Sequence, residues 1–233
     1  MQALARLTVV VPVGPGDVLS PDLRMQLCAL PRAAQVCVVC VDEAAAHRVR
    51  DSFDRSVPGP QWDCINAAAG RASQQNAGAE LARNQWVWFL HADALLAPAT
   101  LPALARLVEN DAPALGYFDL RFLDDGPALM ALNTLGTWVR SRCLGLPFGD
   151  QGLVLPRDTF MRLGGFDPSL DGGEDHDLVW RARHAGVTLR ALRAPLYTSA
   201  RKYAQRGWGA TTMLHLRETW RQARRFSSAQ VKQ

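Results

Sequence analysis

The sequence predicts an α/β protein built on a mostly parallel mixed sheet that is flanked by helices. Two uncharged runs are rich in β-branched or aromatic residues, at 7–13 and at 86–90. Runs of this kind are typical of strands that are buried on both faces of a sheet. Segments with helical patterning separate the runs, as they do in βαβ units.

The strands and helices are expected to alternate along the chain. The first strand ends in the tight loop Gly14-Pro15-Gly16-Asp17, and Ser73 is a credible N-cap for a helix that follows the loop at 70–72. We expect strands at 7–13, 35–41, 62–67, 86–90, 116–122, within 145–155 and at 188–193. We expect helices at 22–30, 44–53, 73–83, 99–109, 128–143, 157–163, 172–186 and 208–226.

Length and charge favour one domain with a cationic end. The chain has 233 residues and no composition that marks a linker. We expect a main unit at 1–205 and a basic amphipathic C-terminal helix and tail at 206–233 that belongs to the same domain. Residues 181–233 contain twelve Arg or Lys and one acid, whereas the rest of the chain is acidic overall. Nucleic acid, anionic lipid and a phosphorylated substrate can all match such a surface.

Simple sequence patterns predict the cellular location of the protein and the role of its cysteines. The sequence shows neither a signal-peptide pattern at its start nor an apolar run long enough to span a membrane. We therefore expect a cytoplasmic protein, with the basic C-terminal helix packing on the sheet, pairing with a second subunit, or lying on the inner face of the membrane. Cys37 and Cys40 should point to opposite faces of one strand, so they form neither a zinc pair nor a redox motif.

Two polar side chains close the aromatic strand at 86–90. His91 and Asp93 fall beyond its carboxyl end, where open α/β sheets bind their ligands. The simpler alternative is that Asp93 only caps the next helix or makes a turn.

Two helix starts are further candidates. Arg71 lies beside a helix N-terminus, which suits an anion, although an alanine-rich helix with a stray arginine explains that stretch about as well. Asp175 begins the helix at 172–186 behind two glycines, and helical spacing places it on the same side as Val179 and Ala182, toward the protein. The alternative for Asp175 is a first-turn acid that only favours the helix dipole.

Several motifs in this order resemble the inverting nucleotide-sugar glycosyltransferases of family 2, which have the A-type fold. They are the opening strand at 9–13, Asp42, Gly70-Arg71-Ala72-x-Gln74-x-Asn76-x-Gly78-Ala79, Phe89-Leu90-His91-Ala92-Asp93, Gly164-Gly165-Phe166-Asp167 and Gly172-Gly173-Glu174-Asp175-x-Asp177-Leu178. The resemblance covers about residues 6–205. Leu90-His91-Ala92-Asp93, Gly149-Asp150-Gln151 and Thr198-Ser199-Ala200-Arg201 are similar to a small soluble branch that includes the enzymes named for arsenosugar biosynthesis.

The resemblance implies a role for each matching position. The carboxylate of Asp175, with Glu174 beside it, would act as the general base that deprotonates the acceptor hydroxyl. His91 and Asp93 match the motif that holds Mg²⁺ or Mn²⁺ against the donor diphosphate. The donor nucleotide-sugar would contact Pro12, Val13, Asp42, Arg71, Asn76, His91, Ala92, Asp93 and Arg201, with Lys202 beside the last of these. The sugar or the acceptor would contact Asp150, Gln151 and Gly173.

Two departures from the family pattern keep other readings open. His91 replaces the first aspartate of the metal motif, and the loop at 14–17 lacks the family's usual polar pair. A non-catalytic, degenerate sugar-nucleotide-binding protein is therefore the main alternative, and a nucleotidyltransferase is a second one that lacks its usual basic glycine-rich loop. A phosphatase of the haloacid dehalogenase type is excluded because its aspartate pair is missing from the first strand. We expect no nucleic-acid partner, and binding by the C-terminal helix is the minor alternative.

Overall fold

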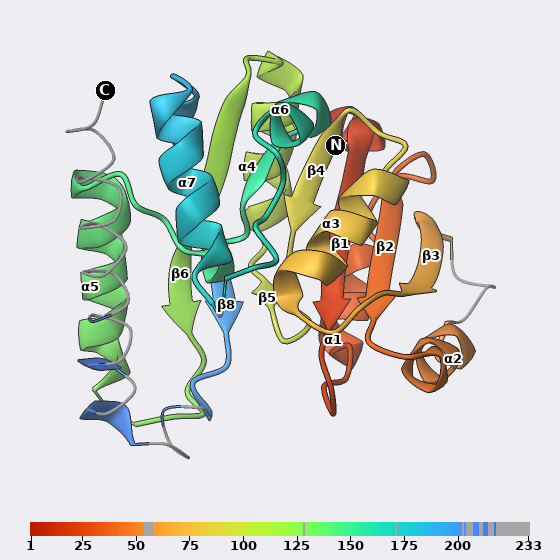
Figure 1. The fold of residues 1–233 in the computed structure, drawn as a ribbon, viewed down its shortest axis with the longest axis horizontal. Coiled ribbons are helices and arrows are strands. Elements are labelled where there is room, and N and C mark those ends of the chain that lie inside the picture. Colours follow the sequence, from red (N-terminus) through yellow and green to blue (C-terminus); the bar gives the residue numbers. More distant parts are fainter. Residues whose placement is uncertain are drawn as a thin grey trace.

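A single mixed sheet runs through the computed structural model, and helices cover both of its faces (Figure 1). The structure describes residues 1–53, 58–127, 129–170, 172–201, 203, 207–209, 212, 213 and 217. Within these residues the sheet has eight strands, in the order β3-β2-β1-β4-β7-β6-β8-β5. The strands are β1 (Leu7–Val13), β2 (Gln35–Cys40), β3 (Gln61–Asn66), β4 (Trp86–Phe89), β5 (Leu95–Leu96), β6 (Ala114–Phe122), β7 (Val154–Pro156) and β8 (Thr188–Thr198).

Two of the eight strands, β7 and β5, run opposite to the other six. Strands β1 to β4 are mutually parallel where they pair, and β6 is parallel to β8. The short strand β7 lies between β4 and β6 and is antiparallel to both, and β5 is antiparallel to β8 at the sheet's edge. The predicted α/β class with a mostly parallel, mixed sheet is therefore confirmed.

The helices divide between the two faces of the sheet. The core on one face includes residues of η1, α1, α2 and α4, and the core on the other includes residues of α3, α6 and α7. Figure 1 shows α5 at the left-hand edge of the molecule, beyond β6. The bounds are η1 (Gln2–Arg6), α1 (Pro21–Leu27), α2 (Glu43–Asp51), α3 (Arg71–Leu81), α4 (Thr100–Asn110), α5 (Met130–Cys143), η2 (Gly149–Gln151), α6 (Arg157–Arg162) and α7 (Glu174–His184).

Burial on both faces explains the uninterrupted apolar run of β1. All seven of its residues are buried, and Val9 and Val11 enter one core while Val10 enters the other. No face of this strand meets water, so no alternation with polar residues is required. The same holds for β4, whose residues are all buried.

Three details of the prediction are corrected by the structure. Helix α3 begins at Arg71 with Gly70 as its N-cap, so Ser73 lies inside the helix and is not the cap. Strand β8 does not end at Arg193 but continues to Thr198. Its pairing with β6 is irregular between Ala191 and Pro195, and this interval contains Arg193, whose φ is positive. The two-residue strand β5 was not predicted, since a run so short carries no periodicity.

Other predictions agree with the structure or concern residues outside the part that it describes. Cys37 and Cys40 belong to different cores, as predicted, and the five cysteines are free thiols. Across the described residues, none of the helices combines the length and the hydropathy needed to span a bilayer. Lys202 and most of the predicted helix at 208–226 lie outside the described residues, so the division at 205/206 stays a prediction.

Glycine substitutions in two helices should have opposite effects on stability. A Cβ atom added to Gly78 in α3 would lie 2.4 Å from Cγ1 of Val10 in β1, whereas one added to Gly136 in α5 would meet no atom within 4 Å. We expect Gly78→Ala to lower the free energy of unfolding by about 1–3 kcal/mol through overpacking. Gly136→Ala should raise it by about 0.5–1 kcal/mol through helix propensity. Urea denaturation measures both, and an unchanged midpoint in Gly78→Ala would contradict the close packing of α3 on β1.

Candidate functional site

The strand directions bring several loops to one edge of the sheet. Because β1, β2 and β4 are parallel, the residues that follow Val13, Cys40 and Phe89 emerge at the same edge. Strand β7 is antiparallel to β4, so the loop that precedes β7 starts there too. The amide of Phe89 donates to the carbonyl of Leu153 at 2.9 Å, and this bond ties the loop with Asp150 to the end of β4.

His91 and Asp150 form a hydrogen-bonded pair at this edge. Nδ1 of His91 lies 2.8 Å from Oδ1 of Asp150. A carboxylate can only accept, so Nδ1 is the donor of this bond. Nε2 of the same ring is buried and has no hydrogen-bond partner among the described residues. The bond to Asp150 therefore fixes the orientation of the His91 ring and leaves Nε2 without a hydrogen-bond partner in the described chain.

Arg71 is surrounded by carboxylates. Its Nε lies 3.6 Å from Oε1 of Glu174, a side chain that is almost fully buried at the start of α7. Burial lowers the pKa of Arg71, but the negative charges of Asp150, Glu174, Asp175 and Asp93 raise it, and the net pKa lies above its ordinary value. The guanidinium is thus the cation that these acids share.

Asp175 is an ionised carboxylate held by backbone amides. Its Oδ2 accepts from the amide of Gly149, and its Oδ1 accepts from the amide of His176 at 2.9 Å. Burial raises the pKa of Asp175, but the neighbouring His176 ring, the Gly149 amide and the charge of Arg71 lower it, and the net pKa is below its ordinary value. A Cβ atom on Gly149 would lie 3.0 Å from Oδ2, so this glycine permits the close approach.

The inner side of α5 also reaches this cluster, which the sequence did not suggest. Nη2 of Arg140 lies 2.7 Å from Nε2 of His176, and its guanidinium sits 3.6 Å from the centre of the Phe148 ring. Burial lowers the pKa of Arg140 to about 10, and the charge of Asp175 opposes that shift. Neither Arg140 nor His176 belongs to a motif that would have identified it from the sequence.

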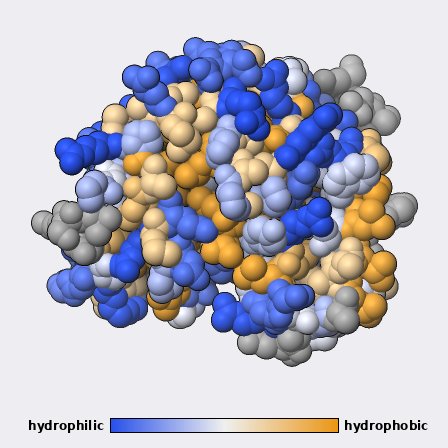
Figure 2. Space-filling view, turned by 180° about the vertical axis from the view of Figure 1, so that it is seen from behind, coloured by the Kyte–Doolittle hydropathy of each residue, from blue (hydrophilic) through white to orange (hydrophobic). Residues whose placement is uncertain are grey.

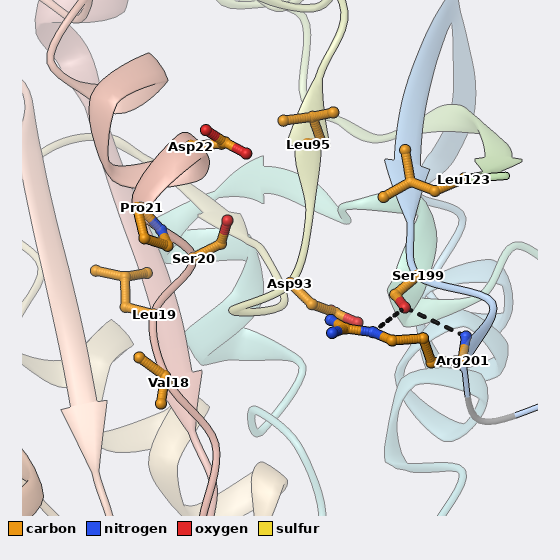
Figure 3. A pocket seen from close by; sticks show the side chains of 10 residues that line it. All are labelled: Val18, Leu19, Ser20, Pro21, Asp22, Asp93, Leu95, Leu123, Ser199 and Arg201. Atoms are coloured by element: carbon orange, nitrogen blue, oxygen red, sulfur yellow. Dashed lines mark hydrogen bonds between the residues drawn. The ribbon is translucent and has the colours of Figure 1, made fainter. Parts of the chain in front are cut away.

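Asp93 and Arg201 line a pocket beside this cluster. The pocket has a volume of about 320 Å³ and its walls come from the segment 18–22, β5, the end of β6 and the turn after β8. Figure 3 shows the carboxylate of Asp93 and the guanidinium of Arg201 pointing toward each other across it. Nε of Arg201 lies 2.9 Å from Oγ of Ser199, and Asp125 holds that turn by accepting from Ser199 Oγ at 2.6 Å.

Two of the predicted ligand residues make internal contacts. Gln151 is fully buried, and its amide donates to the carbonyl of Phe118 and accepts from the amide of Phe148. Asn76 forms a similar two-way bond with the backbone of Phe166. In this structure both side chains hold loops around the site through these backbone bonds.

The other predicted residues lie around the same edge. Pro12, Val13 and Ala92 are buried at strand ends. Asp42 is exposed, and its Oδ1 accepts from the amide of Ala45 as the N-cap of α2. Gly173 is the N-cap of α7 in a left-handed conformation, with φ of 77°.

Gln74 completes the floor of this edge, although it was not among the predicted site residues. Its buried Nε2 donates to the carbonyls of Val13 and Val39, at 2.9 and 2.7 Å. It thus joins α3 to the ends of β1 and β2. Its place in the motif at 70–79 was the signal that could have identified it.

The middle of the chain is similar to a known protein family. Residues 65–167 match the family model of glycosyl transferase family 2. The matched stretch contains Arg71, His91, Asp93 and Asp150, whereas Asp175 lies beyond it. The O-antigen biosynthesis protein RfbC of Myxococcus xanthus is 30% identical over 146 residues, which are 60% of this chain and 11% of that protein.

Solved structures share the fold at low sequence identity. TarS 1–349 of S. aureus matches with a TM-score of 0.62 and 14% identity, over 83% of this chain and 60% of that one. The mannosyltransferase PcManGT from Pyrobaculum calidifontis, in complex with GDP-Man and Mn²⁺, matches with a TM-score of 0.56 and 22% identity, over 83% and 56%. The sheet and its helices thus have the A-type glycosyltransferase fold. The chain spans about a tenth of its curated relative and less than two thirds of these structures.

Removing the shared cation should shift the titration of Asp175. Arg71→Gln deletes one of the groups that lower the pKa of Asp175, so we expect that pKa to rise, as measured by NMR titration of the carboxyl carbon. An ionised Asp175 stabilises the fold above its unfolded pKa, and this contribution is lost as the pH falls through the lower folded pKa. In Arg71→Gln this contribution should therefore be smaller, and its loss should be complete at a higher pH.

The control for this titration is a similar arginine outside the site. Arg83 lies 3.1 Å from Asp63, and Arg83→Gln should leave the titration of Asp175 unchanged. An unaltered titration in Arg71→Gln would contradict the shared-cation arrangement.

Proposed function

We propose that the chain, whose residues 65–167 match the family model of glycosyl transferase family 2, moves a sugar from a nucleotide-diphosphate-sugar to an acceptor hydroxyl with inversion. The observation that carries this proposal is Asp175, which is ionised and held at the helix start beside Arg71, His91 and Asp150. A single displacement needs one base for the attacking hydroxyl and positive charge for the departing diphosphate. The named side chains offer both at one edge of the sheet.

Asp175 suits the role of the base because its geometry leaves acceptor capacity. A carboxylate has about four lone-pair sites, and the amides of Gly149 and His176 occupy one on each oxygen. An acceptor hydroxyl can donate to a remaining site and lose its proton there as its oxygen attacks the anomeric carbon. Glu174 keeps Arg71 in place at 3.6 Å and so supports the same charge balance.

The site's charge favours a divalent cation. Asp93, Asp150, Glu174 and Asp175 all act on Arg71, so the site carries more negative than positive charge before an anionic diphosphate enters. Bound Mg²⁺ or Mn²⁺ would supply positive charge against the leaving diphosphate. This need for positive charge is the physical reason to expect metal assistance here.

The residues fit a cation that takes most of its ligands from the donor. Within the described residues, no group of three or more His, Cys, Asp or Glu side chains could hold a metal. Mg²⁺ is commonly held by one or two carboxylates together with phosphate oxygens, and Asp93 meets that requirement. His91 can add Nε2, whose lone pair is oriented by the bond to Asp150, as in carboxylate–histidine–metal arrangements.

The donor would lie along the edge between the first strand and the pocket. Arg71 and Arg201 would meet its phosphates, and Asp42, which follows β2, would lie near the ribose or base. Pro12, Val13 and Ala92 form the apolar floor, and Asn76 shapes the wall by holding Phe166. The sugar or acceptor would lie near Asp150 and Gly173, with Gln151 supporting that loop from below.

A non-catalytic sugar-nucleotide-binding protein is the second candidate. The observation that favours it is that both oxygens of Asp175 accept from backbone amides, which is also how a purely structural carboxylate is used. Such a protein would bind the donor and neither hydrolyse nor transfer it.

Replacing the proposed base should separate binding from transfer. We expect Asp175→Asn to retain nucleotide affinity and to lower the rate of transfer, or of donor hydrolysis, by about 10²–10⁴-fold. Radiolabelled donor turnover measures the rate, and calorimetry measures the affinity. Asp158→Asn, a first-turn acid of α6 that is exposed, is the matched control. Undiminished turnover in Asp175→Asn would rule out the base, and absent turnover in the parent protein would favour the second candidate.

The donor and the metal can be identified through stability. A ligand that binds only the folded chain raises its stability by RT ln(1 + [L]/Kd), about 2.7 kcal/mol at a hundredfold excess over Kd. We expect one nucleoside diphosphate from a panel to raise the melting temperature with Mn²⁺ or Mg²⁺ and to do so less without it. Asp93→Ala should abolish the metal-dependent part. An equal shift with and without metal would contradict metal assistance.

A further inference from the structure

The side of helix α5 that faces the protein carries polar groups, whereas large apolar side chains face solvent. Figure 2 shows orange atoms along the right-hand edge, where α5 lies in that view. Nη2 of Arg142 donates to both carboxylate oxygens of Asp119 in β6, and Arg140 reaches His176 of α7. Polar contacts are therefore a main attachment of this helix to the rest of the fold. The large apolar side chains that it exposes are Leu132, Leu135, Trp138 and Val139.

Arg140 contacts two residues of the candidate site at once. Its guanidinium lies 3.6 Å from the centre of the Phe148 ring, and its Nη2 lies 2.7 Å from Nε2 of His176. A guanidinium can only donate, so Nε2 of His176 is the acceptor of this bond. The rings of Phe148 and His176 also contact each other, with centroids 5.0 Å apart. The three side chains thus form one cluster that joins α5, the residue before η2, and α7.

This cluster lies on both sides of the hydrogen bond that holds the proposed base. The amide of Gly149 donates to Oδ2 of Asp175, and the amide of His176 donates to Oδ1 at 2.9 Å. Phe148 directly precedes Gly149 in the chain. Arg140 therefore contacts the side chain of one amide donor and the side chain of the residue next to the other donor.

The chain between α5 and η2 is attached to α7 at its other end as well. Nη1 of Arg183 in α7 donates to the carbonyl of Leu144 at 2.9 Å, and Leu146 is buried in the core that includes residues of α7. The segment 144–149 is thus held against α7 at both ends. Arg140 supplies contacts at the end where the carboxylate of Asp175 lies.

Arg140 also acts on Asp175 through its charge. Burial lowers the pKa of Arg140 to about 10, which leaves the guanidinium charged at neutral pH, and the charge of Asp175 opposes that shift. The interaction of two charges is mutual, so the charge of Arg140 favours the ionised form of Asp175. The other groups that act on this carboxylate are the ring of His176, Arg71 of α3 and Asp150 of η2.

We propose that Arg140 is a positioning residue that keeps the carboxylate of Asp175 in the orientation in which it takes the proton of the acceptor hydroxyl. This role rests on the proposed function, because sugar transfer is the step that needs the base. A base must lie within hydrogen-bond reach of the proton that it takes, and a misplacement of about 1 Å can lower a rate by about 10²-fold. Arg140 acts through Phe148 and His176, so it needs no contact with the substrate.

The first test is NMR titration of Asp175 in the variant Arg140→Met, followed at its carboxyl carbon and at the amide proton of Gly149. Loss of the cation and of its contacts should raise the pKa of Asp175 and reduce the change in the Gly149 amide shift during the titration. The matched control is Arg142→Met, which breaks the ion pair with Asp119 on the same helix. Both variants should lower the melting temperature, but the control should titrate as the parent does.

A second variant keeps the cation and removes one of its contacts. Phe148→Leu deletes the ring that the guanidinium covers, so it should weaken the Gly149 bond and raise the pKa of Asp175 by less than Arg140→Met does. This variant decides the question if Arg140→Met does not fold. An unchanged titration of Asp175 in the folded variants would overturn the positioning role, as would an equal shift in Arg142→Met, which would reflect a loosened helix.

Turnover measurements connect the position of Asp175 with the proposed reaction. We expect Arg140→Met to lower kcat at least about tenfold and to leave the affinity for the donor nucleotide, measured by calorimetry, unchanged. The acid limb of its pH–rate profile should move to higher pH, because the base must be ionised and its pKa is raised. An unchanged kcat would overturn the positioning role. Absent turnover in the parent would instead overturn the proposed function, and the NMR comparison would still show whether Arg140 holds the carboxylate.

Discussion

The pairing of β4 with β1 on one side and with β7 on the other is the constraint on which the site depends. The parallel pair brings the end of β4 to the edge at which β1 and β2 also end. The antiparallel pair brings the loop before β7 to that edge, so Asp150 meets His91. All residues of β1 and β4 are buried, and a slip by one residue would exchange their two core faces.

The charged and polar side chains at this edge come from separate elements of the fold. Arg71 comes from α3, His91 from the end of β4, Asp150 from η2, and Asp175 from α7. The amide of Gly149 donates to Asp175, so the same short turn that presents Asp150 to His91 also holds the proposed base. A shift of this turn would therefore move Asp150 away from His91 and would also move the amide that holds Asp175. The geometry links the proposed metal and donor side to the proposed acceptor side through one backbone segment.

The sequence located most of these residues but could not assign what each one contacts. Helical spacing placed Asp175 toward the protein, and the structure agrees, because its carboxylate is held by the Gly149 amide. Asn76 and Gln151 carry amides that suit a sugar hydroxyl and a peptide group equally well. The structure pairs both of them with backbone, and no local pattern distinguishes these outcomes.

The sequence by itself determined most of the strands and helices of the described chain, the position of the polar residues at strand ends and the cationic character of the C-terminal quarter. These depend on periodicity, on glycine and on charge, which act over a few residues. Only the tertiary structure decided that Arg140 reaches His176, that four acids share Arg71, and that α5 turns its leucines outward. Each of these depends on which distant segments pack together and in which register, and the free energy of that packing is summed over the whole core rather than over one element.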